Sequence, residues 1–365
     1  MLTQRQYAFT LIAMNNTLNN DQQQHLTVRA KYQNNFARHI LGVTLHLQSA
    51  IMQALTTQHG HSQLRINFEA YISLAAAQGA RLSDIARTLG ISRQAANQTA
   101  NQIEAAGYLR RINDPADKRA KILITTPRAK KLIAQGIKEA NKQHRLLVEI
   151  TGEHAIQQST KAVIALNKTL GLLATYSSVD ENNLQLAAAL PRLSNYISDR
   201  LQTLTMNKGH PKLKRNYGFV LTAIGPAGGR IQTMAAAQDV SKQAISVIAT
   251  ELEQLGYIER RPSPNDPRQL LLFFTSAGHK LIADSVASVG ELEAELSELI
   301  GSATMKSLKS TMEKIYQHLH LEEDIFDNGS TSYLNKDINA LAQEIKQQLG
   351  KSQVKALAKL LSEHY

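Results

Sequence analysis

One short stretch of the chain groups side chains that can hydrogen-bond to the edges of DNA bases. It contains Arg93, Gln94, Asn97, Gln98 and Asn101, and this face is almost free of carboxylates. In the major groove Arg pairs with guanine, whereas Asn or Gln pairs with adenine. Together these residues indicate contact with DNA, although ordinary solvated surface would explain each of them taken singly.

The pattern around this stretch predicts two helices joined by a turn. Residues 82–91 indicate the first helix, which Ser83 can cap, and Gly90 can take the left-handed turn that follows. The second helix begins at Ser92 and continues toward Gly107. Its packed side is expected to hold five residues at helical spacing: Ala95, Ala96, Thr99, Ile103 and Ala106.

A basic hairpin follows the second helix. Residues 108–112 and 120–125 predict two strands around a proline turn. This hairpin, called the wing below, carries the cations Arg111, Lys118, Arg119 and Lys121. Small helical hairpins also occur as protein-binding modules, but the attached basic hairpin favours a DNA reader.

The composition fits a folded protein with a polyanionic partner. The 365 residues are 43% apolar, enough for about two domains. The net charge is +11 and the sequence pI is 9.6, which suits nucleic acid but also an anionic membrane surface. Residues 1–180 contain 21 Lys and Arg against 10 Asp and Glu, so the whole excess lies in the first half.

Several other classes of protein find no support in the sequence. The absence of cysteine excludes disulfides and thiolate metal sites within this chain. No signal peptide and no apolar run of ~20 residues are present, which predicts a cytoplasmic protein without a membrane partner. No phosphate loop, nucleophile elbow or dinucleotide fingerprint indicates an enzyme or a bound cofactor.

The twelve histidines raise the question of a metal site. His39 and His46 are seven residues apart, and His59 and His61 are near neighbours, but no His-x-x-x-His pair with a carboxylate partner occurs. Ordinary surface or core histidines are the better interpretation and no metal site is predicted, although one near His39 and His46 stays open as an alternative.

The chain repeats itself at a shift of 149 residues. The shift places Ser241-Lys242-Gln243-Ala244 on Ser92-Arg93-Gln94-Ala95, and Gly256-Tyr257 on Gly107-Tyr108. It also aligns residues 280–283 with residues 131–134 without a gap. So long an ungapped register indicates a tandem duplication.

The duplication suggests a division into four parts. They are an N-terminal arm (1–30), a first unit (31–176), a second unit (181–322) and an extra C-terminal helical hairpin (331–365). In the arm, an apolar helix candidate precedes an Asn/Gln-rich connector. In the first unit, the apolar spacing predicts a long amphipathic helix from Phe36 to Leu55 and a second helix from Phe68 to Ala75.

Both units resemble the MarR family of bacterial winged helix-turn-helix regulators. In the first unit, the residues that carry the resemblance are Ser92-Arg93-Gln94, Glu104-Ala105-Ala106-Gly107-Tyr108-Leu109, Asp114, Asp117 and Arg119. Their counterparts are Ser241-Lys242-Gln243, Glu253-Gln254-Leu255-Gly256-Tyr257-Ile258, Asp266, Arg268 and Thr275.

This resemblance implies a fold and a function. The expected fold is mainly α with small β wings (α+β), in which a helical dimerisation-type layer joins two winged helix-turn-helix domains with pseudo-two-fold symmetry. The implied function is sequence-specific binding of double-stranded DNA and control of transcription, commonly repression relieved by a small aromatic acid. Because two units share one chain, a monomeric pseudo-dimer is expected, and the surplus helices leave further homodimerisation possible.

The resemblance also assigns roles to residues. Arg119 and Arg268 are the expected wing-tip arginines that enter the minor groove, and Asp117 and Asp266 can hold their guanidinium groups or simply cap the turn. The remaining expected DNA-binding residues are Ser92, Arg93, Gln94, Asn97, Gln98, Arg111, Lys118, Lys121, Ser241, Lys242, Gln243, Ser246 and Arg260.

Two alternatives remain open. A plasmid-type replication initiator also carries two winged helices in one chain, but its two domains are generally dissimilar, whereas these align without gaps. A non-DNA scaffold could use winged helices to bind proteins. Duplex affinity that falls as salt rises would favour the DNA readings over the scaffold, because phosphate contacts release counterions.

Overall fold

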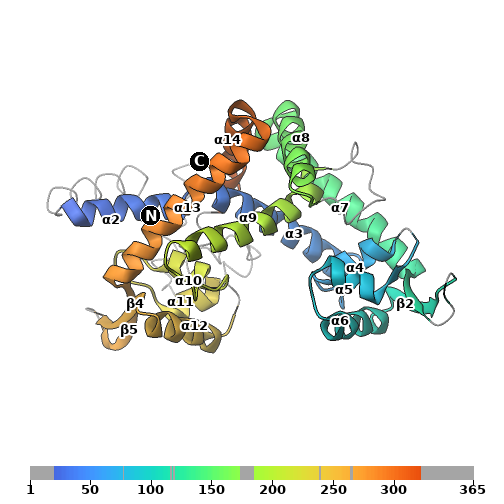
Figure 1. Cartoon of the computed structure of the whole chain (residues 1–365), viewed down its shortest axis with the longest axis horizontal. Coiled ribbons are helices and arrows are strands. Elements are labelled where there is room, and N and C mark those ends of the chain that lie inside the picture. Colours follow the sequence, from blue (N-terminus) through green and yellow to red (C-terminus); the bar gives the residue numbers. More distant parts are fainter. Residues whose placement is uncertain are drawn as a thin grey trace, which may run out of the picture. The chain divides into compact units, whose positions relative to one another are not determined.

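The structure is a computed structural model that describes residues 20–76, 78–115, 117, 120–172, 185–237, 240–263 and 266–321 (Figure 1). Packing divides the chain into two compact units. The described part of the first comprises residues between 20 and 215 and residues 281–321, and that of the second lies between residues 216 and 280. Each unit is described separately below.

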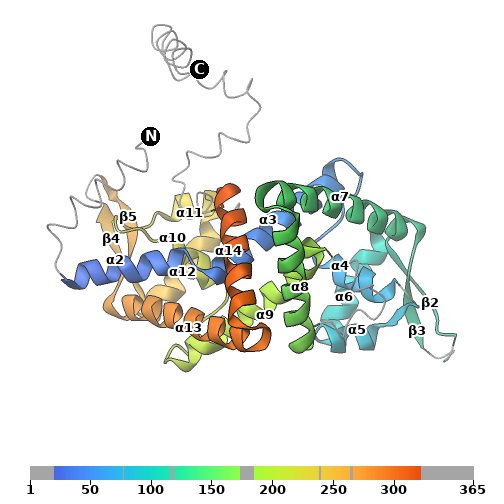
Figure 2. The same cartoon turned by 90° about the horizontal axis from the view of Figure 1, so that it is seen from above.

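The first unit contains the helical layer, which consists of end helices from both repeats. These helices are α3 (Phe36–Thr57), α8 (Glu153–Thr169), α9 (Leu186–Asn207) and α14 (Ser302–His318). By the shift of 149 residues, α9 is the counterpart of α3, and α14 is the counterpart of α8. Two long helices, α7 (Pro127–Thr151) and α13 (Ser276–Ile300), precede α8 and α14 in the chain, and Figure 2 shows α7 running from the first wing to α8.

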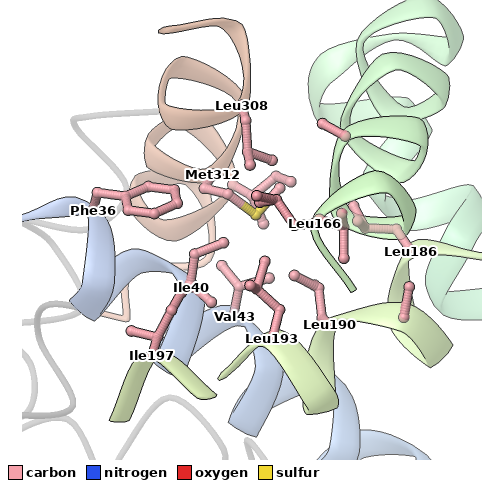
Figure 3. Packing of buried hydrophobic residues seen from close by; sticks show 14 of the residues in the cluster. Phe36, Ile40, Val43, Leu166, Leu186, Leu190, Leu193, Ile197, Leu308 and Met312 are labelled. Carbon is pink, nitrogen blue, oxygen red and sulfur yellow. The ribbon is translucent and has the colours of Figure 1, made fainter. Parts of the chain in front are cut away.

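The core of the helical layer follows from apolar residues at helical spacing. On α3 these are Phe36, Ile40, Val43 and Leu47, each no more than 2% exposed. Figure 3 shows Phe36, Ile40 and Val43 meeting side chains of α8, α9 and α14, and Leu47 belongs to the same buried cluster. The labelled partners are Leu166, Leu186, Leu190, Leu193, Ile197, Leu308 and Met312. Neither repeat covers its own apolar helix faces without the other.

The sharp turn between α7 and α8 depends on Gly152, whose φ of 89° lies in the left-handed region that favours glycine. Gly301 makes the same turn between α13 and α14 with a φ of 83°. The duplication therefore repeats this backbone device at the same position.

Two corresponding contacts across the layer differ between the repeats. On one side α14 presses the buried Tyr316 against α3 at Gly42, where a Cβ would lie 2.6 Å from the tyrosine Cε2. On the other side the counterparts are Asn167 and Pro191, and the Asn167 amide donates to the Ala189 carbonyl at 2.9 Å. The two halves of the layer are similar in backbone but not in side chains.

The first unit also contains the first winged helix. Its elements are α4 (Phe68–Ala75), β1 (Ala80–Arg81), α5 (Leu82–Thr88), α6 (Arg93–Ala105), β2 (Leu109–Asn113) and β3 (Lys121–Thr125). The antiparallel sheet has the order β1-β3-β2, with Ala80 opposite Leu123 and Leu109 opposite Thr125. A separate core beneath α6 includes Phe68, Ile85, Ile103 and Tyr108.

The second unit repeats this winged helix. It contains α10 (Tyr217–Ala223), α11 (Ile231–Ala237), α12 (Lys242–Gln254), β4 (Ile258–Ser263), β5 (Asp266–Phe274) and the first turn of α13. An isolated bridge between Gly229 and Leu272 stands where β1 pairs with β3 in the first copy. Gly225 and Gly228 form a bridge of their own, which makes this glycine-rich stretch a tight turn.

The predicted long helix from Phe36 and the helix from Phe68 are both confirmed. The Asn/Gln-rich connector is wrong from residue 20 on, because Asn20–Gln33 forms a helix, α2. Gln, Arg and Lys are good helix formers and neither Gly nor Pro interrupts this segment, so backbone propensity prevails over its polar character. The arm before residue 20 and the hairpin at 331–365 lie outside the described residues.

We predict that leucines on α3 stabilise the fold according to how deeply they are buried in the layer core. Leu47 is 1% exposed and Leu45, two residues earlier on α3, is 65% exposed. Leu47→Ala should lower the free energy of unfolding by about 2–5 kcal/mol, whereas Leu45→Ala should change it by about 0.5 kcal/mol or less. Urea unfolding followed by circular dichroism measures both, and equal losses would contradict the assigned core.

A second prediction concerns pH and His39 on α3. Burial, with the nearby charges of Arg38 and Lys309, lowers the pKa of His39 from 6.5 to about 4, and its Nε2 lies 2.5 Å from the Asn34 Oδ1. Below pH 6.5 the unfolded chain binds a proton that the folded chain refuses, so stability is lost as pH falls from 6.5 toward 4.

In this pH window the His39→Gln variant should lose less stability than the wild-type chain, because Gln does not titrate. Thermal unfolding of both proteins is compared at pH 7.0, which is above about 6.5 where the window begins, and at pH 5.5 and 4.5, which are within it. Parallel stability curves for the two proteins would show that His39 does not carry the effect.

Candidate nucleic-acid interface

The helices α6 and α12 are called the reading helices below, because the sequence predicts that they contact DNA bases. Both begin with the same capping interaction. The Ser92 hydroxyl accepts a hydrogen bond from the Ala95 N–H, and the Ser241 hydroxyl accepts one from the Ala244 N–H, both at 3.1 Å. Each serine has an extended backbone just before the helix, as an N-cap requires. Ser92 and Ser241 therefore fix where the two reading helices start.

The outward face of α6 carries the residues that the sequence singled out. Its exposed polar side chains are Ser92, Arg93, Gln94, Asn97, Gln98 and Asn101, while Ala96, Ala100 and Ile103 are fully buried. Ala95 is exposed, so its predicted place on the packed side is wrong; the helix presents Ala96 and Ala100 inward instead. The exposed face of α6 contains no carboxylate before Glu104.

On α12 the corresponding face is less polar. Lys242 and Gln243 are exposed, and Ser246 is half-buried. Val247 stands where α6 has Gln98, and it is 55% exposed. The predicted reading residues thus lie on the outer face of both helices, but the second copy offers fewer hydrogen-bonding groups.

Arg111 on β2 lies behind the reading helix. Its guanidinium pairs with Glu104 and donates to the Asn97 Oδ1 at 3.0 Å. A guanidinium only donates hydrogen bonds, so it requires the amide oxygen of Asn97 on its side. The amide NH₂ of Asn97 then points away from Arg111, and the predicted DNA contact of Arg111 itself stays a prediction.

Arg260 repeats this arrangement in the second copy. It pairs with Glu253 and donates to the Thr250 Oγ1 at 3.0 Å. The sequence reasoning counted both arginines among the DNA contacts and did not identify these pairs. The signal was available, since Glu and Arg recur at the same separation of seven residues in both copies.

The first wing is fastened to β1 by an ion pair. The Arg81 Nε donates to the Asp114 Oδ2 at 2.7 Å, and Asp117 lies 3.9 Å from the same guanidinium. The partly buried Asp114 carboxylate raises the pKa of Arg81 above its usual value. In the second copy the position of Asp114 is taken by Ser263. Ser263 offers no carboxylate at this position of the second wing.

The wing tip itself is described in part. Lys121 is exposed on β3, and Arg268 is exposed on β5. Lys118 and Arg119 lie outside the described residues, as does the Asp266 side chain, so the predicted Asp–Arg contacts at the wing tips remain predictions.

A buried polar network joins the first winged helix (α4 to β3), called the first reading head below, to α7 within the first unit. The His61 ring contacts the Tyr108 hydroxyl at 2.9 Å and the Gln135 Oε1 at 2.8 Å. His59 and Lys142 both lie 2.8 Å from the Glu139 carboxylate. Those two hydrogen bonds lower the pKa of Glu139. His61 is thus buried and His59 is half-buried, and both are hydrogen-bonded within the protein.

The part of the chain that the structure describes contains no cluster of three or more His, Cys, Asp or Glu side chains suited to a metal ion. None of the described helices is both long and apolar enough to span a membrane.

Comparison with known proteins agrees with the geometry. A family model described as "MarR family" matches residues 72–120 and again residues 213–269, which are the two winged helices. The chain carries MarR-family winged helices in two copies. They belong to a family of DNA-binding transcription regulators, and the tandem arrangement expected from the repeat is confirmed.

Solved MarR-type structures each cover about one copy of this chain. YusO from Bacillus subtilis is 21% identical and covers 35% of this chain and 90% of its own, with a TM-score of 0.30. Apo MarR from E. coli is 23% identical, with coverages of 34% and 96% and a TM-score of 0.29.

CouR from Rhodococcus jostii RHA1, bound to p-coumaroyl-CoA, is 22% identical, with coverages of 34% and 90% and a TM-score of 0.27. No curated protein is similar enough to count as a match. The family assignment rests on the two matched stretches rather than on these structures.

Proposed function

We propose that this MarR-family chain binds double-stranded DNA in a sequence-specific manner and represses transcription as a covalent pseudo-dimer. The carrying observation is that the end helices of both copies pack into one core within a single chain. In this proposal the helical layer replaces the interface between separate subunits, and α6 and α12 read two half-sites. Such a regulator works where genomic DNA is, so a cytoplasmic location is part of the proposal.

The side chains of the two reading heads support DNA as the partner. Both helices begin with a serine cap and present Arg or Lys and Gln next to it. Arg and the amides can bond to base edges or phosphates, and no carboxylate opposes them on the first turns. The outward NH₂ of Asn97 is suited to an acceptor, such as guanine O6 or thymine O4.

A small-molecule effector is the second element of the proposal. CouR is bound to p-coumaroyl-CoA in its structure, and MepR from S. aureus is bound to ethidium bromide. We propose an aromatic acid or phenol that binds between the helical layer and a reading head. Titration of salicylate against the protein–DNA complex tests this, and release of the DNA is the expected result.

The experiment that tests DNA reading is selection of bound duplexes from a random-sequence pool. Enrichment of a site with two half-sites supports the proposal. A DNA affinity that falls steeply as the salt concentration rises supports phosphate contacts. Duplexes recovered without any enriched sequence would contradict it. Absence of duplex binding at low salt would instead support a protein-binding scaffold.

We predict that the chain in solution is a monomer that already contains its dimer-like layer. Tethering keeps the two copies at an effective concentration of about mM or above, so the layer closes within one chain. Light scattering at micromolar concentration should therefore give a mass near 40.3 kDa. A mass of twice that value would show that the chain associates further through other surfaces.

A further prediction is an operator with unequal halves. The first wing carries Lys118, Arg119 and Lys121, while Pro267, Arg268 and Leu270 stand at these positions in the second. Leu270 is 50% exposed, so the second wing presents an apolar side chain in place of a cation. Fewer phosphate contacts are expected there.

Arg119→Ala should consequently weaken DNA binding more than Arg268→Ala. Base changes in one half-site should cost more affinity than the mirrored changes in the other, because fused copies are free to diverge. Fluorescence anisotropy on the selected duplex measures both comparisons. Equal losses from the two substitutions, together with a palindromic selected site, would contradict the prediction.

A further inference from the structure

The long helices α7 and α13 occupy the same position in the two repeats but carry opposite charge. α7 contains six Lys and Arg against two Glu, a net charge of +4. α13 contains one Lys against five Asp and Glu, a net charge of −4. Because both helices connect a wing to the same layer, the fold itself does not require either charge.

The cations of α7 form a stripe along one exposed face. Arg128, Lys131, Lys138, Lys142 and Arg145 follow each other at intervals of 3, 7, 4 and 3 residues, and all are exposed. We call this set the α7 stripe. The same positions on α13 are also exposed, but they hold Ala277, Lys280, Ala287, Glu291 and Ala294.

The charges of α13 serve the structure of the first unit. Asp284 lies 2.9 Å from the His210 ring, Glu291 pairs with Lys208 at 2.5 Å, and Glu295 pairs with Arg200. These carboxylates hold α13 against α9 and the segment that follows it. Local ion pairing therefore explains the acidic helix.

The cations of α7 have no comparable internal role. Lys142 pairs with Glu139, and the Arg128 guanidinium lies 5.0 Å from the Tyr108 ring centre. Lys131, Lys138 and Arg145 take part in no ion pair among the residues that the structure describes. Lys138 and Lys142 are like charges four residues apart, which disfavours the helix. Lys131, Lys138 and Arg145 are therefore available to an anion outside the first unit.

We propose that the α7 stripe binds phosphates of duplex DNA that extends beyond the first wing. The inference rests on the proposed function, since it needs α6 and the wing to deliver DNA to this face. α7 starts directly after β3, and Figures 1 and 2 show it leading away from the wing toward α8. The stripe is thus continuous with the DNA-binding wing.

The length of the stripe suits a segment of DNA backbone. A helix rises 1.5 Å per residue, so Lys131 and Arg145 are separated by ~21 Å along α7. That distance corresponds to roughly six nucleotides of one strand. α7 leads away from α6, so the flanking DNA bends toward the helix, and the phosphate contacts repay the cost of bending. An acidic protein is the alternative occupant. DNA is favoured because the adjacent wing would place it next to the stripe, and the wing has no comparable role for a protein.

The test compares two duplex lengths and two triple variants. The stripe variant is Lys131→Ala with Lys138→Ala and Arg145→Ala, and two of these positions already hold Ala in α13. The control variant, Lys161→Ala with Lys306→Ala and Lys314→Ala, removes three exposed cations from α8 and α14. Random-sequence duplexes of about two and about four helical turns are titrated between 50 and 200 mM salt, roughly the range over which phosphate contacts are lost.

On the longer duplex, the slope of log K against log salt should be shallower for the stripe variant than for the wild-type chain by about 2 to 3. Each lost phosphate contact reduces the magnitude of this negative slope by about 0.9. On the shorter duplex it should match the wild-type chain, and the control variant should match it on both. Energy transfer between dyes at the duplex ends should also report less bending with the stripe variant.

Equal salt slopes for the wild-type chain and the stripe variant on the longer duplex would overturn the proposal and leave the stripe to an acidic protein. Random duplexes keep this result separate from the proposed function. If selection enriches no sequence but the salt slope on the longer duplex is shallower for the stripe variant, sequence-specific binding is contradicted and DNA binding by the α7 stripe is supported. If selection succeeds and the slopes are equal, only the stripe is excluded.

Discussion

The structure depends on one shared hydrophobic core in the helical layer. α3 and α8 come from the first copy, and α9 and α14 from the second, yet their apolar faces meet in a single buried cluster. Each pair of helices would expose that face to water if its partner were absent, at a cost proportional to the apolar area. Folding of the layer and pairing of the two copies are therefore the same event.

The local parts of this architecture could be predicted from the sequence. Helix starts at Ser92, Ser241 and Thr126, which precedes α7, follow from short-range capping, and the structure contains each of these hydrogen bonds. The predicted cap at Ser83 is wrong, because α5 begins at Leu82 and places Ser83 inside the helix. The repeat of 149 residues likewise places the second reading head without any structural information. Signals that involve a few neighbouring residues or an ungapped register do not depend on tertiary contacts.

The parts that sequence reasoning missed are contacts between distant positions. His61 meets Tyr108 and Gln135, which are 47 and 74 residues further along the chain. Such distances leave no periodic pattern to detect. Arg111 is predicted to contact DNA because a cation on a wing suggests phosphate contact; its ion pair with Glu104 joins β2 to α6 and does not test that contact. Residue type shows that a group can bind an anion but not which anion it meets.

The contact between Gly42 and Tyr316 determines which halves can pair. If two first copies associated, Asn167 would face Gly42 and leave a void where the tyrosine ring now lies. If two second copies associated, Tyr316 would meet Pro191 at a position where α3 has no side chain at all. The mixed arrangement fits both sides, so the layer discriminates against like-with-like assembly. Two copies of this chain are thereby disfavoured from swapping like halves, so closure of the layer within one chain is favoured over exchange between chains.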